Sequence, residues 1–171
     1  DGYLLDTDRI NEAPVLSNII WEKPNLTVKI PLIFSTVSAE LKFSPDGTKI
    51  LYTATASATL PPGLISLPGS NPTPQIRNLT PNKTYVYDLK EDRNYLINAP
   101  VTWFPSSRHL ISVTNSQISI MEYDGTNKAT VFSGQFNPSS VFVWPNWSKI
   151  VILTSLGNSG GQENLYTINL R

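Results

Sequence analysis

Short runs in which apolar and polar residues alternate dominate this chain, and most runs end at a cluster of turn residues. A period of two indicates strands that bury one face. Three segments share one layout, which is a strand with an aromatic residue near its end, a proline turn and a second strand rich in β-branched residues. These segments are residues 39–53, 101–113 and 141–153. The pattern therefore predicts three β-hairpins of one kind.

The first hairpin has the clearest turn chemistry. Pro45 presets φ, Asp46 can accept a hydrogen bond from the backbone two residues on, and Gly47 readily supplies a positive φ. In the other two segments Ser106-Ser107 and Asn146-Trp147 occupy the same place with weaker turn formers. We expect a tight turn at all three positions.

A third strand is predicted after each hairpin, and a shorter fourth strand after the first two. The third strands are expected at residues 84–89, 118–125 and 165–170, and the fourth at 94–97 and 129–132. Four antiparallel strands that recur about every 40 residues are the layout of a β-propeller blade. Pro105 and Pro145 are 40 residues apart, whereas Pro45 and Pro105 are 60 apart. The additional 20 residues fall in one long loop, Ala54 to Lys83.

The blade pattern gives the domain organisation. Residues 1–171 are expected to form a single, partial or small, all-β propeller region with four-stranded antiparallel blades. Gly2 to Asp6 aligns with a third strand, so the chain is expected to enter in the middle of a blade. The expected parts are the end of an upstream blade and a crossover (1–35), a blade with the long loop 54–83 (36–98), a second blade (99–133) and a last blade without its outer strand (134–171).

Composition changes this picture by excluding several functional classes. Lys plus Arg and Asp plus Glu are 13 each, so the chain has no net charge that would attract nucleic acid. Cysteine is absent and His109 is the only histidine, which excludes disulfides, thiolate metal sites and multi-histidine metal sites. Because no apolar run reaches 18 residues, we expect no membrane insertion by this segment. The 14 prolines suit strands and turns better than helices.

Two resemblances follow from particular motifs. Phe43 to Ile50, together with Tyr87-Asp88-Leu89, resembles the repeat of TolB-like propellers, the WD40-like or PD40 family, and the likeness covers residues 37–171. Met121 to Asn127 and Asn164 to Arg171 are similar to the C-terminal propeller of bacterial PEGA-domain proteins. This second likeness implies the extracellular face of the bacterial cell envelope, with an anchor in an upstream segment outside this chain, or a secreted protein. Neither likeness implies catalytic residues or a cofactor.

The residues with catalytic chemistry are better explained as structural. His109 is expected on the strand after the second turn, at a solvated blade edge, and no G-x-S-x-G motif presents a nucleophile. Asp6, Asp88 and Asp124 are expected at one repeated blade position, where they cap turns, although such a ring could also bind a cation. We therefore expect no catalytic, cofactor-binding or metal site.

The partner-binding candidates are hydrophobic. Trp103 and Trp144 fall at the repeated aromatic position and are expected to pack between blades, whereas Trp147 lies in a turn and is expected to be exposed. The long loop is expected to be an extended surface segment with polyproline II character, or an arm that binds a partner. Its apolar residues are costly to leave in water, so we expect them to pack on something; they are Leu60, Leu64, Ile65, Leu67 and Ile76.

The expected function is a non-enzymatic binding or scaffolding module of a bacterial cell-envelope protein that acts through protein–protein contacts. Two alternatives stay open at this point. One is the propeller cap of a serine oligopeptidase-type enzyme whose catalytic domain lies outside this chain, and the other is a carbohydrate-binding, lectin-like propeller. An incomplete set of blades leaves apolar sheet faces open at both ends, so self-association is also expected.

Overall fold

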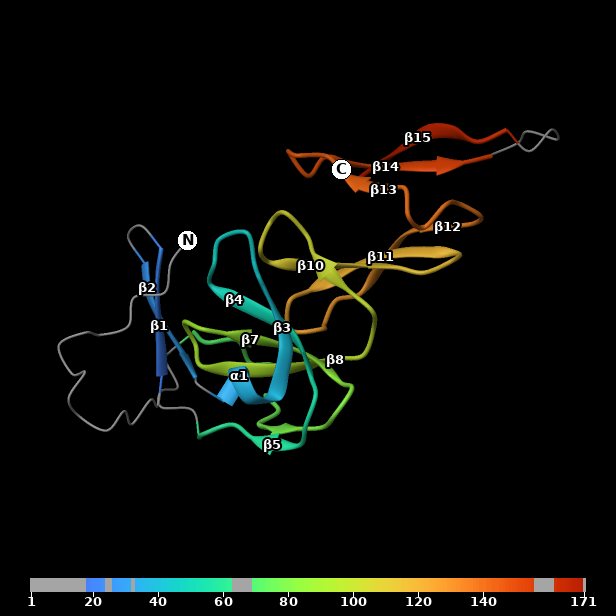
Figure 1. Cartoon of the computed structure of the whole chain (residues 1–171). Helices are drawn as coiled ribbons and strands as arrows, with labels where there is room; N and C mark the ends of the chain where they lie inside the picture. The colour runs from blue at the N-terminus through green and yellow to red at the C-terminus, as the bar shows by residue number, and fades with distance from the viewer. Residues whose placement is uncertain (1–17, 24–25, 32, 63–68, 156–161, 171) are drawn as a thin grey trace. The chain divides into compact units, whose positions relative to one another are not determined.

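The structure, a computed structural model, describes residues 18–23, 26–31, 33–62, 69–155 and 162–170. The chain divides into two units, Asp1–Leu96 and Ile97–Arg171, and each is described here by itself (Figure 1). Nearly every regular element is a strand, and all strand pairs are antiparallel. The fold class is therefore all-β, as the alternating pattern predicts.

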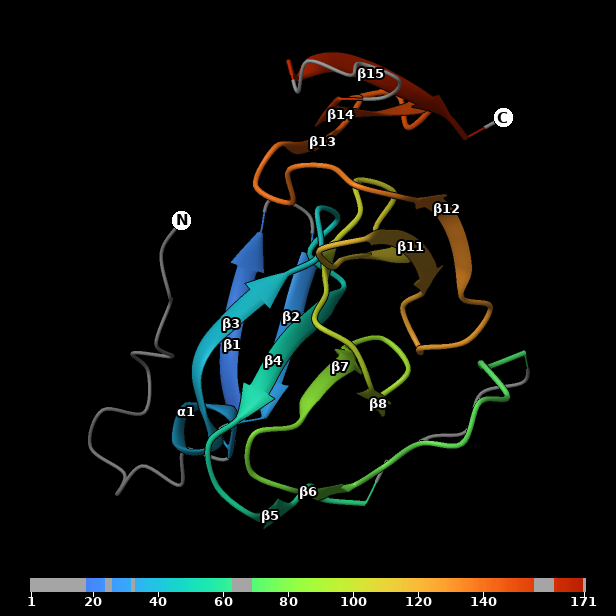
Figure 2. The same cartoon turned by 90° about the vertical axis from the view of Figure 1, so that its right-hand side faces the viewer.

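The first unit is built around one four-stranded sheet. Its strands lie in the order β3 (Ser38–Phe43), β4 (Lys49–Ala54), β7 (Thr84–Asp88) and β8 (Arg93–Ile97). Between β4 and β7 the long loop forms a small separate hairpin of β5 (Ala58–Thr59) and β6 (Asn78–Leu79), which lie side by side in Figure 2. A further hairpin of β1 (Asn18–Lys23) and β2 (Leu26–Pro31) comes before the short helix α1 (Ile33–Val37).

The core of the first unit lies on one face of this sheet. Phe34 of α1 is 1% exposed, and its ring meets Tyr52 and Tyr87 edge-on with centroids 4.8 and 5.0 Å away. Phe34 and Val37 are one helical turn apart, so both point to the same side of α1. Burial raises the pKa of both Tyr52 and Tyr87, so the two phenols stay neutral. The helix therefore caps this face of the first sheet.

The second unit contains two sheets. One has four strands in chain order, β9 (Thr102–Trp103), β10 (His109–Val113), β11 (Gln117–Glu122) and β12 (Ala129–Ser133). The other has three strands, β13 (Val141–Val143), β14 (Lys149–Thr154) and β15 (Asn164–Asn169). Their facing sides share one core, in which Ile111 and Ile118 of the first sheet pack with Ile150 and Ile152 of the second.

The strand order agrees with most of the predicted pattern. All three predicted hairpins form, as β3–β4, β9–β10 and β13–β14, and the predicted fourth strands form as β8 and β12. The expected strand at Gly2 to Asp6 lies outside the described residues. The sequence pattern does not predict β1, α1 or the β5–β6 hairpin. Within the described residues the sheets stay open and none closes into a barrel.

Candidate functional site

The three proline turns share one hydrogen-bond pattern. In each, the backbone N–H of the residue before proline donates to the carbonyl of the first residue of the next strand, at 2.9 to 3.0 Å. In each, the N–H of the second residue after proline donates to the carbonyl of the residue before proline, at 2.8 to 3.1 Å. The side chain after proline also accepts the N–H two residues on, an Asx or Ser turn. The turns are Ser44–Lys49, Phe104–His109 and Trp144–Lys149.

One position of the turn has a left-handed backbone in all three copies. It is occupied by Gly47, Ser107 and Trp147, with φ of 70°, 60° and 63°. Glycine adopts this conformation without steric cost, whereas a bulky side chain does so rarely. Gly47 and Ser107 are buried, but Trp147 is 44% exposed. The exposure of Trp147 confirms the sequence-based expectation, and its backbone conformation makes the position unusual.

A second repeated bond aligns the third strands. The N–H of Leu89, Tyr123 and Leu170 donates to the carbonyl of Thr48, Arg108 and Ser148, at 3.0, 3.0 and 2.9 Å. Asp88 is therefore equivalent to Glu122 and Asn169, which pair with the strand residues that follow the other two turns. The expected match of Asp88 with Asp124 is wrong. Asp124 lies beyond β11, where its Oδ1 accepts hydrogen bonds from the N–H and the Oγ1 of Thr126.

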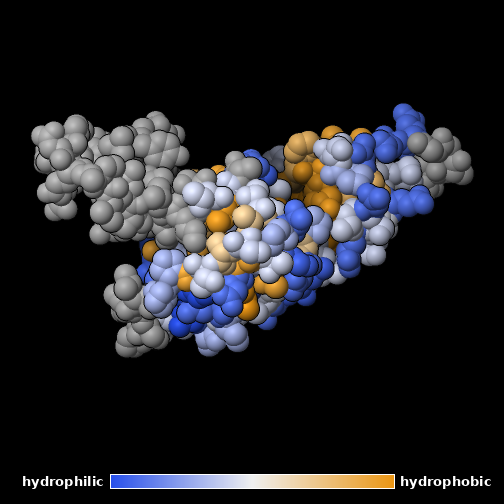
Figure 3. All heavy atoms as spheres, turned by 60° about the horizontal axis from the view of Figure 1, so that its bottom comes forward, coloured by the Kyte–Doolittle hydropathy of each residue, from blue (hydrophilic) through white to orange (hydrophobic). Residues whose placement is uncertain are grey.

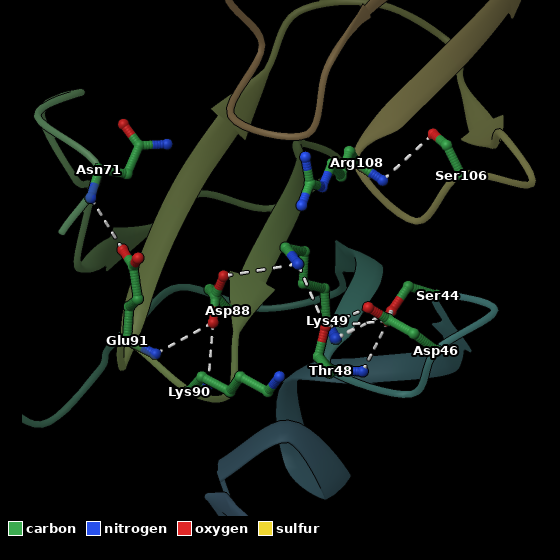
Figure 4. A network of polar contacts seen from close by, with 10 residues as sticks. All are labelled: Ser44, Asp46, Thr48, Lys49, Asn71, Asp88, Lys90, Glu91, Ser106 and Arg108. Atoms are coloured by element: carbon green, nitrogen blue, oxygen red, sulfur yellow. Dashed lines mark hydrogen bonds and ion pairs between the residues drawn. The ribbon is translucent and has the colours of Figure 1, made fainter. Parts of the chain in front are cut away.

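Asp88 takes part in a buried ion pair (Figure 4). Its Oδ2 lies 3.8 Å from Nζ of Lys49, and the two side chains are only 5% and 11% exposed. The other carboxylate oxygen accepts the N–H groups of Lys90 and Glu91, at 2.9 and 3.0 Å. Lys49 also donates to Oγ1 of Thr48, at 3.1 Å. The pair joins the start of β4 to the end of β7, which is a structural role.

Asp46 organises the first turn. Its Oδ1 accepts hydrogen bonds from Oγ of Ser44 at 2.6 Å and from the N–H of Thr48 at 3.0 Å. Burial alone would raise the pKa of Asp46, but these hydrogen bonds and the charge of Lys49 outweigh it. The pKa of Asp46 therefore lies below the ordinary aspartate value of 3.8. In the third turn Asn146 makes the same contact without a charge, to the N–H of Ser148 at 3.1 Å.

His109 lies where the sequence places it, on the strand after the second turn. Its Nδ1 is 2.8 Å from Oγ of Ser106, the turn residue. Glu122 faces it across the strand pair, but Oε1 of Glu122 accepts a hydrogen bond from the amide of Asn127, at 2.7 Å. The serine is thus a turn former, since its Oγ also accepts the N–H of Arg108 at 3.3 Å. These contacts give His109 a structural explanation.

The long loop folds back on the outer strand of its own sheet. The N–H of Ile76 donates to the carbonyl of Asn94, and the amide of Asn94 donates to the carbonyl of Ile76, both at 2.7 Å. Oδ1 of the same amide accepts the hydroxyl of Tyr52, at 2.9 Å. Arg77 bonds to Asp92 at 3.1 Å. The loop therefore covers the edge of β8, where exposed backbone groups would otherwise attract another chain.

This folding decides where the predicted apolar arm residues lie. Leu60 is 2% exposed and belongs to the core of the first unit, so its side chain offers no surface to a partner. Ile76 is 38% exposed. Leu64, Ile65 and Leu67 lie outside the described residues. Only Ile76 and Trp147 among the described candidates reach the surface.

The expectation that Trp144 packs between blades is wrong. The turn pattern makes Trp144 equivalent to Phe104, while Trp103 is equivalent to Val143, which pairs with Ile150 as Trp103 pairs with Leu110. Phe104 is 4% exposed, but Trp144 is 47% exposed and lies over Nζ of Lys149, 5.6 Å from the ring centroid. Phe142 and Leu165 of the same sheet are 60% and 70% exposed. Figure 3 shows hydrophobic patches that interrupt the hydrophilic surface on the face it draws.

The described residues were also compared with the requirements of a metal site and of a membrane-spanning helix, and they meet neither. Among them, no group of three or more histidine, aspartate or glutamate side chains could hold a metal ion. Nor does any helix among those residues have the length and apolar character to span a bilayer. Comparison with known proteins gives no family: no family model matches the chain, and no curated protein matches it. Trp147 and its turn are therefore the best candidate site.

Proposed function

We propose that this chain is a β-propeller-type binding module that recognises a protein partner through Trp147. The supporting observation is that Trp147 combines a left-handed backbone, with φ of 63°, and a side chain that is 44% exposed. Each property costs free energy. Gly47 avoids both costs, whereas Ser107 shares the left-handed backbone but is buried and exposes no large apolar side chain. A residue that adopts a strained backbone and exposes an indole is better explained by binding than by a contribution to stability.

The cost at this position has a known scale. A left-handed conformation costs a residue with a side chain about 1–2 kcal/mol relative to the ordinary helical region. Tryptophan is also the side chain most enriched at the energetic centres of protein interfaces. Pro145 and the hydrogen bond from the N–H of Trp147 to the carbonyl of Trp144, at 2.8 Å, fix the turn before a partner arrives. A fixed turn loses little conformational entropy on binding, which favours affinity.

The propeller part of the proposal rests on the repeat. Three sheets share the same turn, the same third-strand hydrogen bond and the same strand order; they are β3-β4-β7-β8, β9–β12 and β13–β15. In the second unit two consecutive sheets pack face to face, as neighbouring blades do. The likeness to TolB-like and PEGA-domain propellers supports a non-enzymatic role at the outside of the bacterial cell envelope, which we include in the proposal.

A peptide selection tests the proposed site and does not require an identified partner. Random peptides displayed on phage are panned on the immobilised chain, and the affinities of the enriched peptides are measured. Removal of an interface-centre tryptophan costs about 2 kcal/mol or more, so Trp147→Gly is expected to weaken binding roughly 30-fold. Ser107→Gly is the matched control, because it makes the same change at the equivalent, buried position. Enriched peptides that bind Trp147→Gly as tightly as the wild type would refute the site, as would the absence of enrichment.

A carbohydrate ligand is the second candidate, because an exposed indole is also a stacking surface for sugar rings. A glycan array discriminates the two candidates. Glycan binding that disappears with Trp147→Gly would assign the same residue to a carbohydrate, whereas a blank array alongside enriched peptides supports the protein partner.

A further inference from the structure

The outward edge of β15 differs from the corresponding edge of the other two sheets. In those sheets the third strand pairs with a fourth strand on its outward side, as β7 pairs with β8 and β11 with β12. In the last sheet β15 pairs with β14, and no other described strand pairs with it. The repeat therefore shows what kind of element fits this edge. It is an extended strand that runs antiparallel, as β12 does beside β11.

The hydrogen-bond phase of β15 identifies which residues use this edge. In an antiparallel strand the N–H and C=O of one residue point to the same side, and the side alternates along the strand. The N–H of Leu170 donates to the carbonyl of Ser148, on the β14 side, at 2.9 Å. In the second sheet the same phase points Glu122 outward, and its N–H donates to the carbonyl of Thr126 at 3.0 Å. The β15 residues whose backbone groups point outward, with no hydrogen bond to any described residue, are Leu165, Thr167 and Asn169.

Nothing in the composition or shape of β15 blocks its edge. Its sequence, NLYTIN, contains no charged residue, proline or glycine, and its pairing with β14 has no register shift. The other two outer strands differ, because the long loop covers the edge of β8 and a register shift interrupts the pairing of β12 with β11. Proteins commonly protect an edge with charge, proline or a bulge. A regular, uncharged edge is therefore suited to pair with another strand.

We propose that β15 pairs with β15 of a second copy of this chain, antiparallel and about a twofold axis at Thr167, so that the last sheet continues from one copy into the other. The hydrogen-bond phase sets this register. All outward residues of β15 meet their counterparts only when Thr167 faces Thr167 and Leu165 faces Asn169 of the second copy. Each of these pairs exchanges two backbone hydrogen bonds. The proposal is independent of Trp147, which lies in the turn before β14.

The side chains also fit this register. It places Tyr166 of each copy beside Ile168 of the other, on the side of the sheet where both residues pack against the core of the second unit. Both side chains are only half-buried in the single chain, so the pairing covers more of their apolar surface. Aromatic residues beside β-branched residues, and threonine beside threonine, are favourable cross-strand pairs.

Charge favours a second copy as the occupant. Glu163 lies just before β15, whereas Lys149 pairs with Asn169 at the other end of the strand. Antiparallel pairing brings the acidic end of each β15 toward the basic end of the other, whereas parallel pairing would bring like ends together. Because β15 itself contains no charge, no like charges face each other along it. The edge is therefore complementary to itself.

Light scattering and amide exchange of the whole chain test the pairing. The mean mass is expected to rise from 18.9 kDa toward twice that value between about 1 and about 500 μM, and to stop there because the dimer uses the edge. Amide exchange measured by NMR gives the residues. The outward N–H groups of Leu165, Thr167 and Asn169 are expected to exchange about 10-fold more slowly when about nine-tenths of the chain is dimeric. The N–H groups of Tyr166 and Ile168, which face β14, are expected to be protected at every concentration.

Thr167→Pro removes one outward N–H and leaves the bonds between β15 and β14 intact, since edge strands accept proline where the N–H faces solvent. We expect it to raise the dissociation constant of the dimer roughly 30-fold, because two hydrogen bonds are lost at the axis. Thr130→Pro is the matched control. Thr130 is an exposed threonine of β12 whose partner, Ser119, directs its backbone groups to β10, so its N–H also points outward. This variant is expected to stay dimeric, and circular dichroism checks that both variants fold.

The position of the axis has a separate test, which also decides the matter if Thr167→Pro does not fold. Thr167→Lys and Thr167→Glu each place like charges opposite one another in a homodimer, whereas their equimolar mixture places opposite charges there. The mixture is expected to associate at least about 5-fold more tightly than either variant alone. A wild-type monomer at every concentration would overturn the proposal, as would species that keep growing beyond the dimer. Folded Thr167 variants that all associate like the wild type would also overturn it, because another surface would then form the dimer.

Discussion

Lys49 and Asp88 face each other across β4 and β7, with Nζ 3.8 Å from Oδ2 and both side chains nearly buried. The equivalent pairs in the other two sheets are His109 with Glu122 and Lys149 with Asn169. The same two positions thus carry a buried ion pair in one sheet and other polar residues, aligned by the strand register, in the other two. The position in the repeat therefore determines which residues face each other, and the residue types at that position differ from sheet to sheet.

The two partners of this ion pair are expected to differ in their effect on stability. Without Lys49, the carboxylate of Asp88 still accepts the N–H groups of Lys90 and Glu91. Without Asp88, the buried ammonium loses its ion-pair carboxylate, while it still donates to the hydroxyl of Thr48 and feels the charge of Asp46. We predict that Asp88→Ala lowers the free energy of unfolding by about 3–5 kcal/mol and that Lys49→Met lowers it clearly less. Urea unfolding of both variants measures this; equal losses would contradict it.

The first turn is expected to make stability depend on acid pH. The folded-state pKa of Asp46 lies below its ordinary value of 3.8, so the unfolded chain binds the proton more readily. The stabilisation by Asp46 is present above that ordinary value and is lost as the pH falls through the lower, folded-state pKa. In Asp46→Asn the new amide oxygen can still accept the N–H of Thr48, as Asn146 accepts the N–H of Ser148 in the third turn at 3.1 Å. We predict a shallower loss of stability below about pH 4 for Asp46→Asn, measured by thermal unfolding from about pH 7 to about pH 3; parallel curves would contradict it.

The long loop gives a prediction that separates core from surface. Leu60 is 2% exposed, and its truncation to alanine is expected to cost about 2–5 kcal/mol of unfolding free energy. Ile76, from the same loop, is 38% exposed, and Ile76→Ala is expected to cost under about 1 kcal/mol. Chemical denaturation compares the two variants directly. A neutral Leu60→Ala would mean that the loop does not pack on the sheet as described.

The strands and turns can largely be predicted from the sequence, because their signals are local. The Pro45-Asp46-Gly47 turn and the alternation after it predict the β3–β4 hairpin, which forms. The β5–β6 hairpin escapes prediction, since two-residue strands leave no alternation to detect. Leu60 shows the same limit: whether an apolar loop residue joins the core or meets a partner depends on contacts between distant residues, such as Ile76 with Asn94.

The candidate site can be predicted only in part. An exposed Trp147 follows from its place in the turn, but its left-handed backbone becomes evident only when the three turns are superposed on Gly47 and Ser107. The exposure of Trp144 does not follow from its place in the repeat, because the equivalent residue Phe104 is only 4% exposed. Phe104 is buried where β13–β15 packs on its sheet, whereas no described residue buries Trp144, which is 47% exposed. Burial at this position therefore depends on what covers the sheet, and a local sequence pattern does not report that.

The unfolding free energy of Trp147→Gly, compared with the wild type, tests the central claim most directly. Glycine relieves the left-handed conformation, so we predict that the variant is more stable by about 1 kcal/mol, which raises Tm by roughly 2–4 °C, while it loses binding to the selected peptides. A gain in stability together with a loss of binding would mean that Trp147 is retained for recognition at the expense of the fold. A variant that is less stable than the wild type would contradict the account, because Trp147 would then be a packing residue.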